Sequence, residues 1–228
     1  MQLRDEKKVN DYTAKAIREV LSISSLSGVV DKLFLDDMLY THSIRVSKLA
    51  TQLGITMNLS DELVYKICVA GLLHDIGKIK TPVTILYKPG SLTDEEFEVI
   101  KKHPVDGYNF CKQAGVDAEI CNMVLKHHVK KNSKGYPEGY PTKTLPEEII
   151  TVADIFCALS EKRTYHSALE YRQALDFVDS FEDLDKQVLK ALREAFDDQV
   201  VAPYLIIERR QRGEILGSPL NVGRSDNK

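Results

Sequence analysis

The feature that most restricts the fold of this chain is a set of polar residues placed inside apolar helical patterns. Apolar residues recur at steps of three and four in the region around His42, which falls on the same stripe. His74 ends the apolar stripe of a second predicted helix, and His128 ends that of a third, with His127 at its edge. Asp154 lies within another strongly apolar helical run. A helical domain with imidazoles and carboxylates directed inward fits this pattern.

The burial expected for these groups indicates bound metal. A buried carboxylate that lacks a cation costs several kcal/mol, or its pKa shifts until the group is neutral. One helix can accommodate a single polar residue by local hydrogen bonds, whereas four helices that each direct one inward favour metal ligation. The adjacent His74 and Asp75 offer one ion both a nitrogen and an oxygen. The second carboxylate oxygen of Asp75 can bridge to another ion.

A cation follows this pair in the sequence His-Asp-Ile-Gly-Lys at residues 74–78. Gly77 opens the backbone, and the ammonium group of Lys78 is placed where a phosphate could bind. Alternatively, Lys78 is a solvated cation at a helix C-terminus, where the helix dipole favours it. Both interpretations can hold at once, so Lys78 is a candidate for catalysis and for phosphate binding.

The rest of the chain is predicted to be almost entirely helical, so the expected fold class is all-α. Thr93 with Glu96, and Thr144 with Glu147, have the spacing of capping boxes, which begin helices. Little of the sequence alternates with the period of a strand. The predicted helices lie near residues 11–26, 36–53, 60–75, 93–102, 105–114, 117–128, 145–160, 169–180 and 183–197, with a further one at 200–212.

Several short motifs occur in a fixed order between about Tyr40 and about Tyr165. After residues 74–78 come Lys-Pro-Gly at 88–90, His-Pro at 103–104, His-His at 127–128, Gly-Tyr-Pro at 135–137, Val-Ala-Asp at 152–154 and Arg-Thr-Tyr at 163–165. In this order the motifs resemble the HD-GYP family, a bacterial branch of the HD metal-dependent phosphohydrolases. The resemblance implies an HD-domain helical bundle with a buried two-metal centre.

The resemblance also implies an activity and a set of metal ligands. Proteins of this family hydrolyse cyclic dinucleotides, most often cyclic di-GMP, to pGpG, to GMP or to both. The ligands implied for the first metal are His42, His74, Asp75 and Asp154. Asp75 is expected to bridge to a second metal, whose other implied ligands are His103, His127 and His128. Iron or manganese suits such mixed imidazole and carboxylate ligation.

The remaining site residues are assigned by the same resemblance. Asp75 and Lys78 are the implied catalytic residues. Lys78 is expected to contact one phosphate, and Arg163 the other phosphate or a guanine. The loop that carries Tyr136 and Pro137 is expected to border the substrate cavity. Two divalent cations suit phosphodiester hydrolysis, because they acidify water and neutralise charge that develops on the phosphate.

Departures from the family pattern keep other functions open. Val129 and Asn132-Ser133 stand where the family usually has a glutamate and Asp-Gly. Met38 replaces a glutamate that binds a third metal in some members, so no third metal is expected, and Cys157 replaces a frequent aspartate. One alternative is a catalytically silent HD-GYP signalling or interaction protein. Another is an HD-superfamily nucleotide phosphohydrolase that acts on another nucleotide. If the substrate is not cyclic di-GMP, cyclic GMP-AMP or pGpG is expected next.

Composition limits the partners and the location. The net charge of −3 argues against long nucleic acid as a partner, because such binders are usually basic over a broad face. No apolar run approaches the length of a membrane span, and no signal peptide is recognised. The four cysteines form no Cys-x-x-Cys pair, which is typical of reduced thiols in a cytoplasmic protein.

Three segments are expected from these patterns. Residues 1–35 are interpreted as an N-terminal helical extension, 36–197 as the HD-GYP domain, and 198–228 as a C-terminal helix with a mobile tail. The amphipathic N-terminal helix is expected to pack on its own domain, to pair with a second copy in a homodimer, or to be the remnant of a connection to a sensor.

Overall fold

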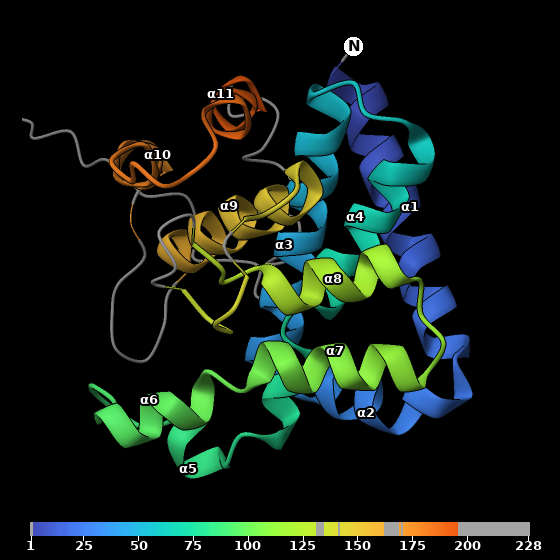
Figure 1. The fold of residues 1–228 in the computed structure, drawn as a ribbon. Coiled ribbons are helices and arrows are strands. Elements are labelled where there is room, and N and C mark those ends of the chain that lie inside the picture. Colours follow the sequence, from blue (N-terminus) through green and yellow to red (C-terminus); the bar gives the residue numbers. More distant parts are fainter. Residues whose placement is uncertain (1, 131–134, 141, 162–168, 170, 196–228) are drawn as a thin grey trace, which may run out of the picture.

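The chain folds into helices joined by short connections, and the part that the structure describes contains no strand. The structure is a computed structural model that describes residues 2–130, 135–140, 142–161, 169 and 171–195. The all-α prediction is confirmed (Figure 1). The elements in order are α1 (Gln2–Ser22), α2 (Ser24–Leu35), α3 (Asp37–Thr56), α4 (Asp61–Leu73), the 3₁₀ helix η1 (Ile76–Lys80), α5 (Val83–Leu86), α6 (Asp94–Ile100), α7 (His103–Gln113), α8 (Ala118–Lys126), α9 (Leu145–Ser160), α10 (Tyr171–Asp179) and α11 (Lys186–Ala195).

Helix α3 lies at the centre of the fold and contacts α1, α2, α4, α9 and α11. Its start is fixed by Asp36, whose carboxylate accepts hydrogen bonds from the backbone N–H groups of Met38 and Leu39, each at 3.1 Å. Its buried face includes Val46 and Leu53, which are fully inaccessible to solvent. This apolar packing holds the helix that carries His42.

The N-terminal region is where the sequence prediction was wrong. One helix at residues 11–26 was expected, but two helices are found, α1 and α2. The chain leaves helical geometry at Ile23, between α1 and α2, and Leu26, Val30 and Leu33 of α2 are buried. Helix α1 contacts α3 and α4 of the same chain, so this helix packs on its own domain.

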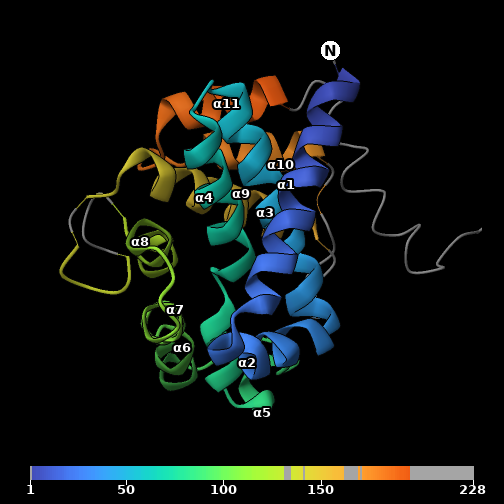
Figure 2. The ribbon, with the colours of Figure 1, turned by 90° about the vertical axis from the view of Figure 1, so that its right-hand side faces the viewer.

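The other helices cover the remaining sides of the α3–α4 pair. Figure 2 shows α7 and α8 on one side of α4 and α1 on the other. Helix α9 packs against α3, α10 packs against α9, and α11 contacts both α3 and α9. The capping boxes predicted at Thr93 and Thr144 are both present at the starts of α6 and α9. The helix predicted at 60–75 ends earlier, at Leu73, and η1 follows it.

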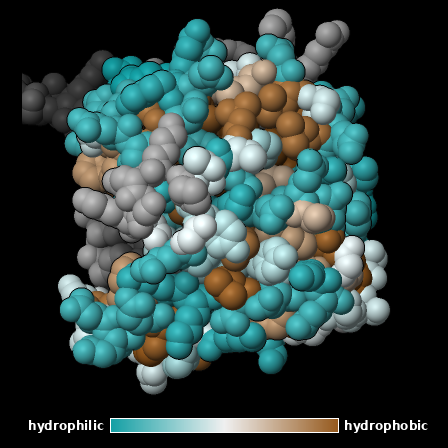
Figure 3. Space-filling model, in the orientation of Figure 1, coloured by the Kyte–Doolittle hydropathy of each residue, from teal (hydrophilic) through white to brown (hydrophobic). Residues whose placement is uncertain are grey.

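The surface of the face drawn in Figure 3 is mostly hydrophilic, with separate hydrophobic patches. Among the described residues, none of the helices combines the length and apolar character that crossing a membrane requires. The helix predicted at residues 200–212 lies outside the described residues.

Candidate metal centre

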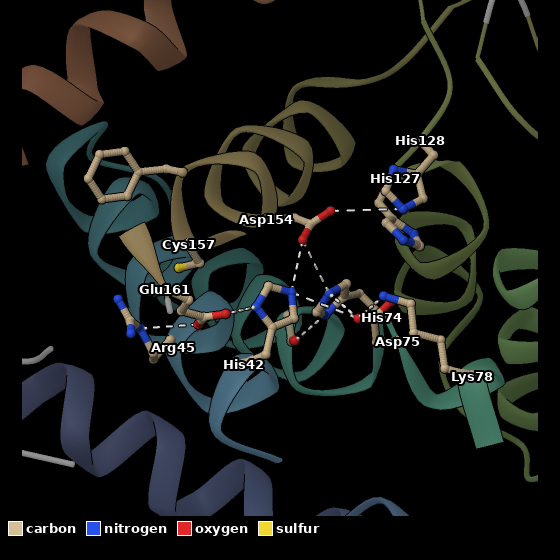
Figure 4. A network of polar contacts seen from close by, with 12 residues as sticks. His42, Arg45, His74, Asp75, Lys78, His127, His128, Asp154, Cys157 and Glu161 are labelled. Carbon is tan, nitrogen blue, oxygen red and sulfur yellow. Dashed lines mark hydrogen bonds and ion pairs between the residues drawn. The ribbon is translucent and has the colours of Figure 1, made fainter. Parts of the chain in front are cut away.

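The candidate ligands come from five separate parts of the chain and meet between α3, α4 and α9 on one side and α7 and α8 on the other. Figure 4 shows side chains from α3 and α9 and from the C-terminal ends of α4 and α8 directed toward one another. Two groups each have their ligand atoms within 4.8 Å of one another. The first group is His42, His74 and Asp75, and the second is His103, His127 and His128. Asp154 lies beside both groups, 2.9 Å from His42 Nε2 and 3.9 Å from His128 Nε2.

Three of the histidines are positioned by the ends of helices. His74 and His127 each follow the last residue of a helix, α4 or α8, and His103 lies three residues after the end of α6. In each case Nδ1–H donates to the carbonyl three residues earlier, at 2.7–2.8 Å. The last carbonyls of a helix have no amide partner within it, so the imidazole caps one of them. Since a carbonyl only accepts, Nδ1 carries the proton and Nε2 is left as a ligand atom.

The arrangement of the facing nitrogens of His103 and His127 indicates whether a cation would bind beside them. Their Nε2 atoms lie 3.1 Å apart. Burial lowers the pKa of both imidazoles well below the usual value, and the charge of Lys78 adds to this shift at His103. Two neutral rings with Nδ1–H therefore direct bare lone pairs at each other, which is unfavourable without a cation. The donor set fits a divalent metal ion.

Asp75 faces both groups at once. Its Oδ2 lies 3.4 Å from His74 Nε2 and 3.8 Å from His42 Nε2. Its Oδ1 lies 3.3 Å from His103 Nε2. Oδ1 of Asp75 and Nε2 of His74 are buried and have no hydrogen-bond partner among the described residues. Burial opposes the charge of Asp75, but Lys78 and His74 hold its pKa well below the ordinary value. This carboxylate has the arrangement needed to bridge two cations.

His42 differs from the other histidines, because it lies inside α3 rather than at a helix end. Its Nδ1 lies 2.9 Å from Oε2 of Glu161, and its Nε2 lies 2.9 Å from Oδ1 of Asp154. Burial alone lowers its pKa, but the charge of Glu161 and the hydrogen bond to Asp154 outweigh burial and raise the pKa to about 9. Glu161 was not predicted from the sequence. No local pattern in the sequence could have found it, because its partner His42 is 119 residues away.

The relative depth of the adjacent histidines is the reverse of the sequence prediction. His128 was expected on the buried stripe and His127 at its edge. In the structure His127 is fully buried, whereas the His128 side chain is 24% exposed. Helix α8 ends at Lys126, so the helical spacing that placed His128 inside does not continue to it. Burial lowers the pKa of His128 to about 4.

Close backbone contact explains two glycines of the motifs. A Cβ atom on Gly77 would overlap the carbonyl oxygen of His103 and the backbone nitrogen of Gly107. A Cβ on Gly135 would likewise overlap the carbonyl oxygen of His128. Only glycine allows η1 to approach α7, and the turn before Tyr136 to approach the end of α8.

The expected substrate-binding residues border cavities next to the centre. A cavity of about 580 Å³ is lined by His42, Asp75 and Lys78. A second cavity of about 320 Å³ is lined by Lys78, Tyr136 and other residues. The first volume is within the usual range of small-molecule sites, roughly 300–1,000 Å³. Lys78 Nζ lies 2.6 Å from Oδ2 of Asp75, so the lysine is directed at the carboxylate rather than at open solvent.

Tyr136 covers the second group of histidines. Its ring stacks on His128 with the centroids 4.6 Å apart. Burial raises the pKa of Tyr136, and the charges of Asp154 and Asp75 add to this. Pro137 follows in the same turn and is half-buried. Arg163 lies outside the described residues, so its expected contact with substrate stays a prediction.

Comparison with known proteins identifies the family. The family model of the HD domain matches residues 29–188. The chain belongs to the HD domain family. The family expected from the motifs is thereby confirmed. HD domains of this family bind divalent metals, and both groups of side chains in this HD domain could hold one.

The chain has similar relatives among curated proteins. It is 31% identical to 3′3′-cGAMP-specific phosphodiesterase 1 of Vibrio cholerae, over 71% of this chain and 38% of that protein. It is 31% identical to a cyclic di-GMP phosphodiesterase of Pseudomonas aeruginosa, over 91% of this chain and 50% of that protein. The chain thus spans half or less of the length of these relatives.

A solved structure shares the fold. An HDG"Y"P protein from Bdellovibrio bacteriovorus aligns with a TM-score of 0.57 and 18% identity, over 82% of this chain and 63% of that one. At this identity the likeness supports the HD-domain architecture alone.

Proposed function

We propose that this chain is a metal-dependent phosphodiesterase that hydrolyses a bacterial cyclic dinucleotide, with cyclic di-GMP as the leading substrate. One observation carries the proposal: Asp75 directs one oxygen to each of two groups of imidazoles beside a cavity of about 580 Å³. Relatives that match 70–91% of the chain are named as cyclic di-GMP phosphodiesterases. Addition of water across one phosphodiester bond opens the ring to pGpG, and a second addition yields GMP.

The proposed ligands divide as the two groups do. His42, His74 and Asp154 are proposed to hold one ion, and the remaining three histidines the other. Asp75 is the shared ligand. Iron or manganese is the proposed metal, because both accept mixed imidazole and carboxylate ligation. When bound, two such cations supply Lewis-acid activation of water and neutralise charge on the phosphate.

The other side chains have supporting roles in the proposed reaction. The ammonium group of Lys78 borders both cavities and can neutralise a phosphate oxygen as negative charge develops. Tyr136 and Pro137 are proposed to form part of the substrate wall, since the Tyr136 ring already covers His128. Arg163 is proposed to contact the second phosphate or a guanine.

Cyclic GMP-AMP is the second candidate substrate. Two relatives of similar identity, at 31%, are named 3′3′-cGAMP-specific phosphodiesterases. Val129, one of the departures from the family pattern, directly follows His128 in the sequence. A silent signalling protein and an enzyme for another nucleotide remain the other outcomes of the test.

The test uses anaerobically purified protein with added Fe(II) or Mn(II). Each cyclic dinucleotide, pGpG and a set of nucleoside triphosphates is offered separately, and the products are resolved by chromatography. Linear product from a cyclic dinucleotide, at a rate set by the added metal, supports the proposal. Two bound metals without turnover of any nucleotide would instead support the silent protein. Turnover of triphosphates alone would support the other phosphohydrolase.

The assignment of segments and the oligomeric state are also proposals. The HD-GYP domain is proposed at 36–197, although the family model begins at residue 29, within α2. A homodimer through the N-terminal helix would have to use the outer face of α1, because Val9, Ala16 and Val20 are buried within the chain. Sedimentation of the purified protein decides the oligomeric state.

A further inference from the structure

His42 differs from three of the other candidate ligands in the partner of its second ring nitrogen. A metal-binding imidazole needs a partner for its second nitrogen, which fixes the tautomer and the ring orientation. His74, His103 and His127 donate to backbone carbonyls near helix ends. The carbonyls around His42 are engaged inside α3, because an α-helix bonds each carbonyl to the amide four residues later. His42 therefore requires a partner from another part of the chain.

Glu161 occupies the position of that partner. It directly follows α9, and its Oε2 lies 2.9 Å from His42 Nδ1. Its side chain is only 11% exposed. Figure 4 shows the His42 ring between two carboxylates, with Glu161 on one side and Asp154 toward the centre. Nε2 of His42 faces the candidate metal ligands, so Glu161 is directed at the opposite edge of the ring.

The other oxygen of Glu161 is held by a cation. Oε1 lies 3.3 Å from Nε of Arg45, which is one helical turn after His42 on α3. The Arg45 guanidinium also donates to Oγ of Ser160 at 3.2 Å. Arg45 is itself 11% exposed. This ion pair joins α3 to the end of α9 and keeps the carboxylate oriented toward the imidazole.

We propose that Glu161, oriented by Arg45, is a positioning residue that sets the tautomer and ligand strength of His42. The inference depends on the proposed metal centre and adds to it a residue outside the ligand set. A charged carboxylate behind an imidazole makes the ring a stronger ligand than a backbone carbonyl does. The ion held by His42 thus depends on Glu161, whereas the ion held by His103, His127 and His128 does not.

The experiment measures metal affinity rather than turnover. Metal-free wild type, Glu161→Ala and Glu161→Gln are titrated with Mn(II) or Co(II), and the bound ions are counted by elemental analysis after equilibrium dialysis. In Glu161→Ala, the affinity for one of the two ions should fall by about 10–100-fold, with the other unchanged. Glu161→Gln should lose less affinity than Glu161→Ala, because its amide oxygen still accepts the Nδ1–H. It should still lose some, because the amide carries no charge.

Asp94→Asn is the matched control, because Asp94 lines the same cavity but has no contact with a histidine among the described residues. It should retain the wild-type affinity for both ions. If Glu161→Ala does not fold, as judged by circular dichroism of the metal-free protein, Glu161→Gln decides alone. Wild-type affinity for both ions in the folded variants, or an equal fall for both, overturns the role of Glu161.

The failure of the proposed function has a different signature. A wild-type protein that binds fewer than two ions contradicts the two-metal centre itself, and this inference with it. If the wild-type protein binds two ions and the Glu161 variants bind both with the same affinity, only the positioning role is contradicted.

Discussion

The two halves of the candidate centre are built in different ways. His103 and His127 are each held by a backbone carbonyl three residues earlier in the chain. His42 is held by Glu161, which is 119 residues away in the sequence. The first arrangement follows from where a helix ends, whereas the second needs two distant helices to be packed correctly. Local chain geometry orients His74, His103 and His127, whereas tertiary structure orients His42.

The two halves also differ in the charge of their histidines. Burial keeps His103 and His127 neutral, because each lacks a carboxylate strong enough to offset desolvation, and the pKa of each is well below the usual value. His42 is equally buried, but it has carboxylates at both nitrogens, and its pKa rises to about 9. In the metal-free protein, therefore, one half of the centre is neutral imidazole and the other carries a proton that a metal has to displace.

Asp75 connects the halves, so its replacement should have the largest effect. Asp75→Asn keeps the size of the side chain but removes the charge that two cations would share. We expect turnover of cyclic di-GMP to fall by more than about 10³-fold and at least one ion to be lost. Chromatography of the products and elemental analysis provide the two measurements. Retention of two ions with normal turnover would show that Asp75 is not the bridge.

Removal of one histidine from each half should separate the two ions. His103→Ala is expected to lose the ion of its own group, while His42→Ala is expected to lose the other. Each variant should keep its helical circular dichroism, because neither side chain belongs to the apolar core. One ion per chain in each variant is the expected result by elemental analysis. Two ions per chain in His103→Ala would contradict the ligand assignment.

The sequence predicted the centre better than it predicted what supports it. His42, His74 and Asp154 could be placed inside from the helical spacing, and all three are buried. The depth of His127 and His128 was reversed, since spacing alone does not reveal that α8 ends at Lys126.

Contacts between distant segments also could not be predicted, because spacing along the sequence describes only local structure. Glu161 was missed because its partner His42 is on another helix, and no local pattern joins the two. The separation of α1 from α2 at Ile23 was missed because the apolar spacing of residues 11–26 runs through this position. The all-α class was predictable, since it depends only on the period of the apolar residues.

The ligand group that contains His103 should depend on the close approach of η1 to α7. In Gly77→Ala, the added Cβ would overlap the carbonyl oxygen of His103, and backbone cannot move aside as a flexible side chain does. We expect the free energy of unfolding to fall by about 3 kcal/mol. The ion of the His103 group should bind more weakly than the other. Denaturant unfolding and metal titration measure the two effects.

Gly28→Ala is the matched control for that substitution. Gly28 lies inside α2, and apart from its chain neighbours and its own helical backbone no described residue lies within 4 Å of its Cβ position. Alanine is the better helix former, so this variant should gain up to about 1 kcal/mol of stability. If Gly28→Ala lowers the free energy of unfolding as much as Gly77→Ala does, close contact with α7 is not the cause of the destabilisation.

The charge difference between the halves should appear as a pH effect on the metal-free protein, smaller than the effect of Gly77→Ala. The folded-state pKa of His42 is raised from 6.5 to about 9, so its contribution to stability is complete below pH 6.5 and is lost as the pH rises through 9. Replacement of Glu161 by glutamine removes a large part of that contribution. The free energy of unfolding of the chelator-treated wild type should exceed that of Glu161→Gln by about 2 kcal/mol at pH 6.5. The difference should become smaller near pH 10, where His42 is neutral in both proteins and only the loss of the Arg45–Glu161 ion pair remains. Denaturant unfolding at the two pH values measures it, and a difference that does not change with pH would show that Glu161 does not act on the charge of His42.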